Sequence, residues 1–256
     1  MKKFLSVLLA LAMIFSLTVT VSADETKGEM DGYVVVLHTN DVHGAISGYA
    51  KVAALKKAYE AEGAYVLLMD AGDFCQGDPT VSVSQGKTAV ELMNMAGYDV
   101  TTLGNHEFDY GMARAKAIIK EADFPYVSCN WVDLRTGLRV LPAVKLFPAG
   151  GKWIAFVGIT TPESFTKSTP AYFMNAKQTK YIYDILGGDD GRKLYDAVQK
   201  AIDKAKTLGA DIIIGLGHLG VDPSSSPWTS EEVIANTTGF DAFIDGHSHT
   251  VMENKQ

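Results

Sequence analysis

Five short segments of the chain place aspartate, asparagine or histidine close beside glycine, and they contain five of the six histidines. The segments are TNDVHG (39–44), AGDFCQGD (71–78), GNHEFDYG (104–111), GHLGVD (217–222) and GHSHT (246–250). Carboxylate, imidazole and amide oxygen together suit divalent Zn, Mn, Fe or Co, whereas a donor set without thiolate argues against a structural zinc site. The segments therefore predict a site for such metals.

The candidate ligands are too many for one ion. In Asp41-x-His43 and His247-x-His249, alternate residues lie on the same side of an extended turn, which favours shared coordination. Two ions roughly 3.5–4 Å apart form the clamp used for in-line displacement at phosphorus, and one bridging carboxylate makes the ligand number right for two. We therefore expect two divalent metal ions, of open identity, held by Asp41, His43, Asp73, Asn105, His218, His247 and His249.

Each of the five segments follows a short apolar run that predicts a β-strand. The predicted strands are 33–38, 65–69, 99–103, 211–216 and 240–245, with another at 153–159. Helices are predicted at 50–62, 88–96, 112–122 and 194–208. This alternation indicates an α/β fold with largely parallel neighbouring strands. Because ligand sites in such sheets gather at the carboxyl ends of strands, we expect the five loops, His106 included, to meet at one rim.

In this order, the five segments resemble the blocks of the calcineurin-like metallophosphoesterases, from about Val34 to Thr250. GNHEFD and GHSHT are highly specific, while DVHG and GHLG would be weak alone. The most similar branch is that of the secreted bacterial 5′-nucleotidases, with UDP-sugar hydrolases and 2′,3′-cyclic-nucleotide phosphodiesterases. The resemblance implies a sandwich of two β-sheets flanked by helices, with the metal site at the C-terminal ends of strands.

The resemblance also implies a role for each residue. One metal would be held by Asp41, His43, Asp73 and His249, and the other by Asp73, Asn105, His218 and His247, with Asp73 as the bridge. His106 would be catalytic, stabilising charge on the phosphoryl group, and Asp109 would orient its ring. A histidine beside a metal site needs a partner that fixes its tautomer and keeps it cationic, and Asp109 is three residues away in a turn. The alternative is that His106 is an eighth ligand.

The activity implied by the resemblance is two-metal hydrolysis of phosphate esters, with nucleotide 5′-monophosphates as the first expectation. A two-metal core serves monoesters and diesters alike, so a phosphodiesterase acting on 2′,3′-cyclic nucleotides and a nucleotide-sugar hydrolase remain alternatives. A catalytically inert surface or binding protein is the alternative from another class. Its expected mark is a missing ligand, and the sequence has all seven ligands as well as His106 and Asp109.

The first 23 residues have the order of a cleaved signal peptide. Lys2 and Lys3 precede an apolar run from Phe4 to Val21, and small residues end it at Ala23. An uncleaved anchor is the alternative, because the run approaches the length that spans a bilayer. We expect a secreted, periplasmic or cell-envelope protein with no stable membrane insertion after cleavage. Residues 24–256 would be the catalytic domain, incomplete at its C-terminus and without the nucleoside-binding domain usual in this branch.

The charge of the chain limits its partners. A formal net charge of −7 does not suit binding to nucleic acid, which needs clustered lysine and arginine. If the substrate is an anion, bound metal must neutralise it. We therefore expect a small-molecule phosphate ester as the partner.

Three further features of the sequence say less about fold and function. Pro162–Gly191 interrupts the alternation of strands and helices, either as a surface excursion near the site or as a solvated insertion without a role. His38 lies within a predicted strand and is expected in the core. Cys75 and Cys129 are expected to be buried and unpaired, although a disulfide between them stays open.

Overall fold

Parallel strands build the two larger sheets of the computed structural model, which describes residues 28–251. One sheet has the order β1-β2-β3 and the other β10-β9-β7-β6, and all their pairings are parallel except that of β6 with β7. The strands are β1 (Val34–Thr39), β2 (Tyr65–Asp70), β3 (Val100–Thr101), β6 (Val144–Ala149), β7 (Lys152–Thr160), β9 (Ile212–His218) and β10 (Ala242–Ile244).

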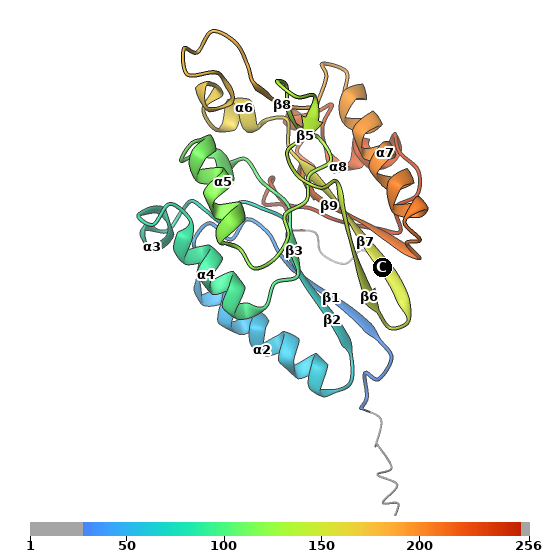
Figure 1. Ribbon diagram of the computed structural model, residues 1–256. Coiled ribbons are helices and arrows are strands. Elements are labelled where there is room, and N and C mark those ends of the chain that lie inside the picture. The colour runs from blue at the N-terminus through green and yellow to red at the C-terminus, as the bar shows by residue number, and fades with distance from the viewer. Residues whose placement is uncertain (1–27, 252–256) are drawn as a thin grey trace, which may run out of the picture.

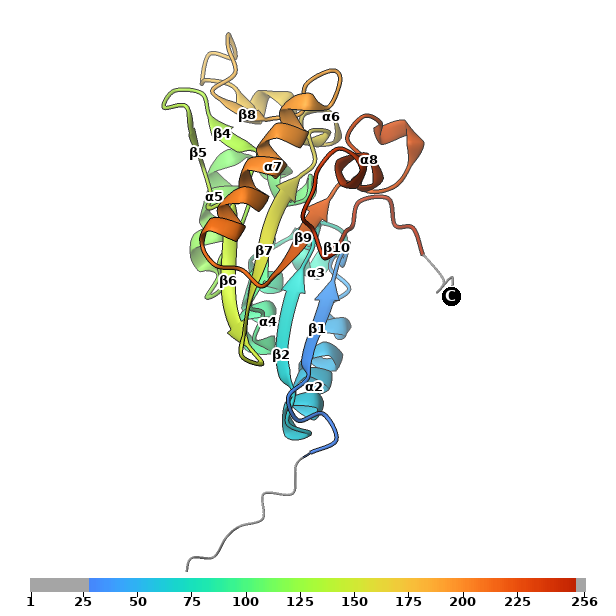
Figure 2. The same cartoon turned by 90° about the vertical axis from the view of Figure 1, so that its right-hand side faces the viewer.

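The strand registers place the carboxyl ends together. Thr39 pairs with Asp70, and Asp70 pairs with Thr101 in the first sheet. In the second sheet Thr160 pairs with His218. Figure 2 shows β1, β2 and β7 pointing the same way, so the loops that follow these strands emerge on one side of the molecule.

Helices cover the outer faces of both sheets. In Figure 1, α2, α4 and α5 lie beside the first sheet, and α7 lies on the opposite side of the molecule, against the second. The helices are α2 (Ser47–Ala61), α3 (Pro79–Ser82), α4 (Lys87–Ala96), α5 (Met112–Glu121), α6 (Ser164–Lys167), α7 (Arg192–Thr207) and α8 (Ser230–Ala235). The sequence of α7 repeats small and aliphatic side chains at helical spacing, from Leu194 to Ala205, and these form its buried face.

A separate apolar layer joins the two sheets. Leu67 and Met69 of β2 share a buried cluster with Phe156 of β7 and Leu216 of β9. Successive side chains of a strand point to opposite faces, so the other side chains of β2 are free to pack against the helices. Leu68 accordingly lies in the cluster that contains residues of α4 and α5. The layers therefore run helix, sheet, sheet, helix, which confirms the predicted α/β sandwich.

Within the described residues there is also a third, small antiparallel sheet, which the sequence did not predict. Its order is β5-β4-β8, formed by β5 (Leu138–Arg139), β4 (Trp131–Asp133) and β8 (Tyr183–Ile185). Strand β6 was also not predicted. It contains Pro148, which cannot donate a backbone hydrogen bond, and it lies at the edge of its sheet, where proline is tolerated.

The segment Pro162–Gly191 is ordered and takes part in the core. It contains α6, a 3-10 helix (Pro170–Phe173) and β8, which pairs with β4. Phe173 is fully buried and packs against Phe108, with ring centroids 5.0 Å apart. A solvated insertion would bury no such side chain, so that reading is wrong.

The two cysteines are buried and free, as expected. They lie in different clusters, Cys75 under α4 and α5 and Cys129 under α7. The predicted signal peptide falls outside the described residues. Within residues 28–251, no helix has the length and apolar character needed to cross a bilayer.

A buried carboxylate joins two of the loops at the carboxyl ends. The side chain of Glu107 is fully buried and accepts hydrogen bonds from the backbone N–H groups of Asp73 (2.9 Å), Phe74 (3.0 Å), Cys75 (3.3 Å) and Gly104 (2.6 Å). A buried carboxylate is tolerated only when such donors replace water. Glu107 therefore fixes the loop after β2 against the loop after β3.

Replacing Glu107 with glutamine should destabilise the fold. The NH2 group of glutamine would face backbone N–H groups, and it cannot accept hydrogen bonds from them. We expect Glu107→Gln to lower the free energy of unfolding by about 2–4 kcal/mol. The measurement is urea unfolding of the metal-free protein. The matched control is Glu91→Gln, an exposed residue whose carboxylate lies 3.7 Å from Lys87, which should change stability by less than about 0.5 kcal/mol. Equal stability of the two variants would refute this role of Glu107.

Candidate active site

The sequence-predicted site residues converge at the carboxyl ends of the strands. Asp41 and His43 follow β1, Asp73 follows β2, and His218 ends β9. Asn105 and His106 follow β3, and His247 and His249 follow β10. Some of these residues lie far apart in the sequence and yet contact each other. The backbone N–H of His247 donates to both carboxylate oxygens of Asp41, at 2.9 and 3.0 Å.

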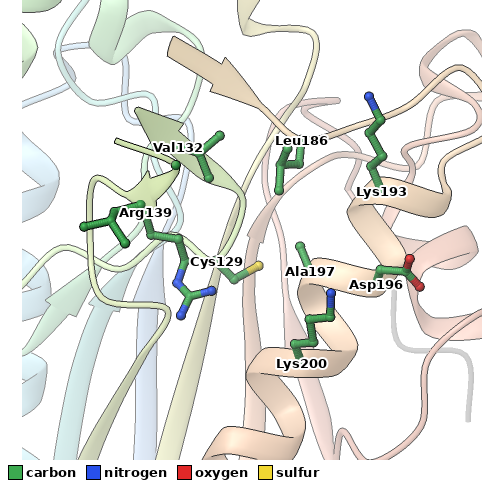
Figure 3. A pocket seen from close by; sticks show the side chains of 10 residues that line it. Cys129, Val132, Arg139, Leu186, Lys193, Asp196, Ala197 and Lys200 are labelled. Carbon is green, nitrogen blue, oxygen red and sulfur yellow. The ribbon is translucent and has the colours of Figure 1, made fainter. Parts of the chain in front are cut away.

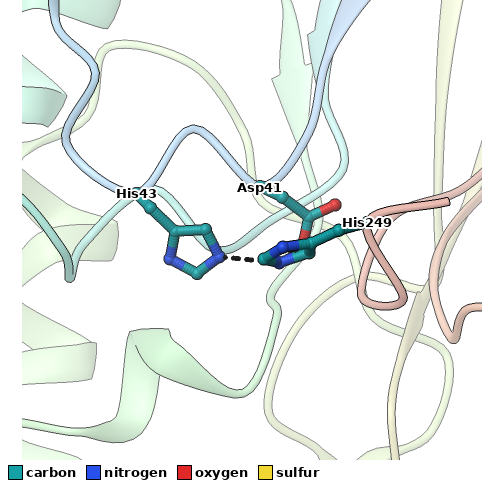
Figure 4. Close-up of side chains that lie close together, drawn as sticks. All are labelled: Asp41, His43 and His249. Atoms are coloured by element: carbon teal, nitrogen blue, oxygen red, sulfur yellow. Dashed lines mark hydrogen bonds and ion pairs between the residues drawn. The ribbon is translucent and has the colours of Figure 1, made fainter. Parts of the chain in front are cut away.

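Asp41, His43 and His249 form the first group of potential metal ligands, with their ligand atoms within 4.8 Å of one another. Figure 4 shows that the two imidazole rings approach each other through ring nitrogens, beside the carboxylate of Asp41. Nε2 of His43 lies 3.1 Å from Nε2 of His249, which in turn lies 3.5 Å from Oδ1 of Asp41. A cation placed among these atoms could bind the lone pairs of both ring nitrogens.

Asp73, His218 and His247 form a second group that meets the same criterion. Nε2 of His218 is 3.0 Å from Oδ2 of Asp73, and the rings of His218 and His247 lie 5.1 Å apart between centroids. A third grouping joins His43, Asp73 and His106. Asp73 therefore lies next to ligand atoms from every neighbouring loop, which is the place that a bridging carboxylate would occupy.

The backbone at these residues adopts a conformation that L-residues avoid. Among the described residues, seven that are not glycine have positive φ, and five of them are candidate ligands. The five are Asp41 (48°), His43 (44°), Asp73 (61°), His247 (81°) and His249 (51°). Such conformations cost of order 1–3 kcal/mol each and persist where the surrounding structure imposes them, typically at functional sites.

Glycine makes the close approach of two of the loops possible. A Cβ on Gly104 would lie 2.1 Å from Oδ1 of Asp73, and one on Gly72 would lie 2.4 Å from the backbone nitrogen of Gly104. Neither position has room for a side chain, so the loops after β2 and β3 can touch only with glycine in both places.

Each of three histidines has one ring nitrogen next to an acceptor outside the site. Nδ1 of His43 lies 3.2 Å from the carbonyl oxygen of Gln76, and Nδ1 of His218 lies 2.6 Å from that of Ala71. Nε2 of His247 lies 2.7 Å from Oε2 of Glu163. An acceptor on one nitrogen holds the proton there and leaves the lone pair of the other free for a metal.

Among the predicted ligands, Oδ1 of Asn105 is buried without a hydrogen-bond partner in the described residues. The buried Nε2 of His218 instead lies next to the carboxylates of Asp73 (3.0 Å) and Asp41 (3.9 Å). Unpaired buried polar atoms are rare in folded proteins and call for an explanation such as a bound ion. With an amide oxygen, carboxylates and imidazoles at hand, the donor set fits a divalent transition metal.

Ionisable groups in the site are strongly coupled. Burial by itself would lower the pKa of His218, but the negative charges of Asp73 and Asp41 outweigh it and raise that pKa to about 10. Burial would likewise raise the pKa of Asp73, but His218 and His106 hold it below its usual value. Without a metal, a proton on His218 balances Asp73, and a bound cation would take its place.

His106 and Asp109 lie beside this cluster and contact each other. Nδ1 of His106 is 2.5 Å from Oδ2 of Asp109, and this hydrogen bond raises the pKa of His106 above its usual value. The backbone N–H of His106 donates to Oδ1 of Asp73 at 2.8 Å. The ring is partly exposed and its Nε2 is 4.0 Å from Oδ2 of Asp73, so His106 borders the site from the solvent side.

The structure adds Glu163 and Glu107 to the residues that organise the site. Neither was predicted, because Glu163 lies 84 positions from His247 and no histidine flanks it. Glu107 lies within GNHEFD, but the prediction used only the neighbouring ligand-type and catalytic residues of that motif.

The placement of His38 differs from the prediction. Its side chain is exposed and lines a cavity of about 520 Å³ together with Asp41 and His249. Strand β1 is an edge strand of its sheet, so His38 near its end has a neighbouring strand on one side alone and is exposed beside the site.

A second cavity, of about 380 Å³, lies between α7 and the β4–β5 hairpin. Arg139, Lys193 and Lys200 line it, but in Figure 3 their charged ends point in different directions. Since cations that bind one anion must converge, this cavity is a weaker candidate than the cluster of histidines and carboxylates.

Comparison with known proteins identifies the family of the chain. The sequence profile of the calcineurin-like phosphoesterase family matches residues 34–251. A snake venom 5′-nucleotidase of Gloydius brevicauda is 30% identical over 86% of this chain and 37% of its own length. A 2′,3′-cyclic-nucleotide 2′-phosphodiesterase/3′-nucleotidase of Haemophilus influenzae is 28% identical over 90% of this chain and 38% of its own length.

The fold is similar to that of solved relatives. The crystal structure of a 5′-nucleotidase precursor from Thermus thermophilus superposes with a TM-score of 0.69 at 26% identity, covering 86% of this chain and 42% of that one. The chain thus spans about two fifths of the length of these relatives, which are nucleotidases and phosphodiesterases. Since the family profile spans nearly all of the described residues, the chain belongs to the calcineurin-like phosphoesterases, a family of metal-dependent phosphoester hydrolases.

Proposed function

We propose that this chain hydrolyses phosphate esters with two divalent metal ions, and that nucleotide 5′-monophosphates are its main substrates. The observation that supports this most strongly is the presence of two groups of potential ligands, one of Asp41, His43 and His249 and the other of Asp73, His218 and His247. His43 connects them, because it is also grouped with Asp73. Asn105 would complete the second group with its unpartnered amide oxygen. The 5′-nucleotidases among the relatives support the choice of substrate.

The protein's residues would divide the work as follows. When bound, two divalent ions would neutralise the phosphoryl oxygens and supply a nucleophilic water at neutral pH. His106, held cationic by Asp109, would donate a hydrogen bond to the phosphoryl group and stabilise the charge that develops on it. Asp109 would keep the ring of His106 in one orientation.

A second candidate activity is hydrolysis of 2′,3′-cyclic nucleotides. The relative from Haemophilus influenzae favours it, since its name includes this diesterase activity. The proposed metals and His106 would contact only the phosphoryl group, which both substrate classes share. The choice therefore depends on contacts to base and ribose.

We expect purified protein to contain two divalent ions per chain and to hydrolyse AMP faster than 2′,3′-cyclic AMP or UDP-glucose. Chelation should abolish activity, and added Mn²⁺ or Zn²⁺ should restore it. The measurements are elemental analysis and phosphate release over this substrate panel. A folded, metal-supplemented sample without metal would sink the proposal, and a preference for the cyclic substrate would favour the diesterase.

His106→Ala should separate catalysis from metal binding. Removing a preorganised group that stabilises charge costs about 10²–10³ in kcat, so we expect that loss with metal content near two. Asp73→Ala should instead lose metal, because its carboxylate would serve both ions. Loss of metal from His106→Ala would show that His106 is a ligand, contrary to this assignment.

We also propose that the protein acts outside the cytoplasm after removal of residues 1–23. In a host that exports it, intact-mass analysis of the exported protein should give an N-terminus at Asp24. A protein retained in the membrane with Met1 or Lys2 at its start would favour the uncleaved anchor.

A further inference from the structure

Glu163 lies just after β7, at the start of α6, and its carboxylate points into the metal-ligand cluster. Oε2 of Glu163 is 2.7 Å from Nε2 of His247. The side chains of both residues are largely buried, with exposed fractions of 12% and 8%. Water is therefore a poor substitute for this contact.

One further segment contacts the carboxylate of Glu163, and local hydrogen bonds fix its backbone. Ser225, in the loop after β9, donates its hydroxyl to the same Oε2 at 2.7 Å. The backbone N–H of Glu163 donates to Oγ1 of Thr161, and its carbonyl oxygen accepts from Thr166 and Lys167 in the first turn of α6. Glu163 is thus a fixed acceptor rather than a mobile surface side chain.

A carboxylate at this position selects one tautomer of His247. It accepts a proton from Nε2, so that the lone pair of Nδ1 is left for a metal. His43 and His218 reach the same result through backbone carbonyl groups and with the opposite nitrogens. Among these three histidines, only His247 has its partner in a side chain, so only its tautomer can be changed by one substitution.

We propose that Glu163 is a positioning residue that fixes His247 as an Nδ1 metal ligand and increases the basicity of its ring. The inference rests on the proposed metal site. Loss of an outer carboxylate partner of a metal-binding histidine costs about 10–100-fold in metal affinity. Glu163 would act only through His247 and would touch neither substrate nor metal.

The test combines Zn²⁺ affinity with the tautomer of His247. We expect Glu163→Ala to bind Zn²⁺ about 10–100-fold more weakly than the wild type in competition titrations. Glu163→Gln should lie between them, because its amide oxygen can still accept from Nε2. Long-range ¹H–¹⁵N spectra of the histidine rings should show the Nε2–H tautomer of His247 in the wild type, with and without Zn²⁺, and a mixed population in Glu163→Ala.

The control is Glu231→Ala, which removes an exposed carboxylate that lines the same cavity as Asp41 and His249. It should change Zn²⁺ affinity less than about threefold, and unfolding curves in chelator should show that both alanine variants fold. Equal affinity and an unchanged tautomer in Glu163→Ala would overturn the inference, as would an Nδ1–H tautomer in the wild type. If the wild type bound no Zn²⁺, the proposed function would fail, while the metal-free spectra would still decide the role of Glu163.

Discussion

The left-handed backbone of five candidate ligands is the constraint on which the rest of the site depends. A carboxylate or imidazole in that conformation is unfavourable in isolation, so neighbouring loops must hold it. They do so by direct hydrogen bonds: Asp41 donates its backbone N–H to Gly72, and His43 donates to Asp73. His43 also accepts from the backbone of Asp78. The loops after β1 and β2 thereby stabilise each other's backbone conformation.

The bracing continues into the side chains. Glu107 joins the loops after β2 and β3 by hydrogen bonds to both, and the carboxylate of Asp41 accepts a hydrogen bond from the backbone of His247. Glu163 reaches the ring of the same histidine from the segment after β7. Loops from both sheets therefore contribute hydrogen bonds that fix the candidate ligands relative to one another. Such preorganisation is what a metal needs in order to bind tightly without first ordering its ligands.

The sequence alone was sufficient to predict the α/β layers and the loops that the structure brings together, because both depend on local patterns. Continuous apolar runs predicted the buried parallel strands, and their glycine-flanked polar ends marked the rim. The third sheet had no such signal, since β5 has two residues and β4 and β8 have three each. Glu163 could not be found, because its role depends on a contact made only in the folded chain. The prediction for His38 was wrong because the apolar run of β1 does not show that this strand lies at the edge of its sheet.

The proposed mechanism requires that two ions share one preformed site, and anomalous X-ray diffraction from crystals grown with Mn²⁺ tests this most directly. We expect two anomalous peaks roughly 3.5–4 Å apart with Asp73 between them. His43 and His249 would coordinate one ion, and His218 and Nδ1 of His247 the other, with His106 outside both coordination shells. A single peak, peaks away from Asp73, or His106 bound directly to an ion would contradict this arrangement.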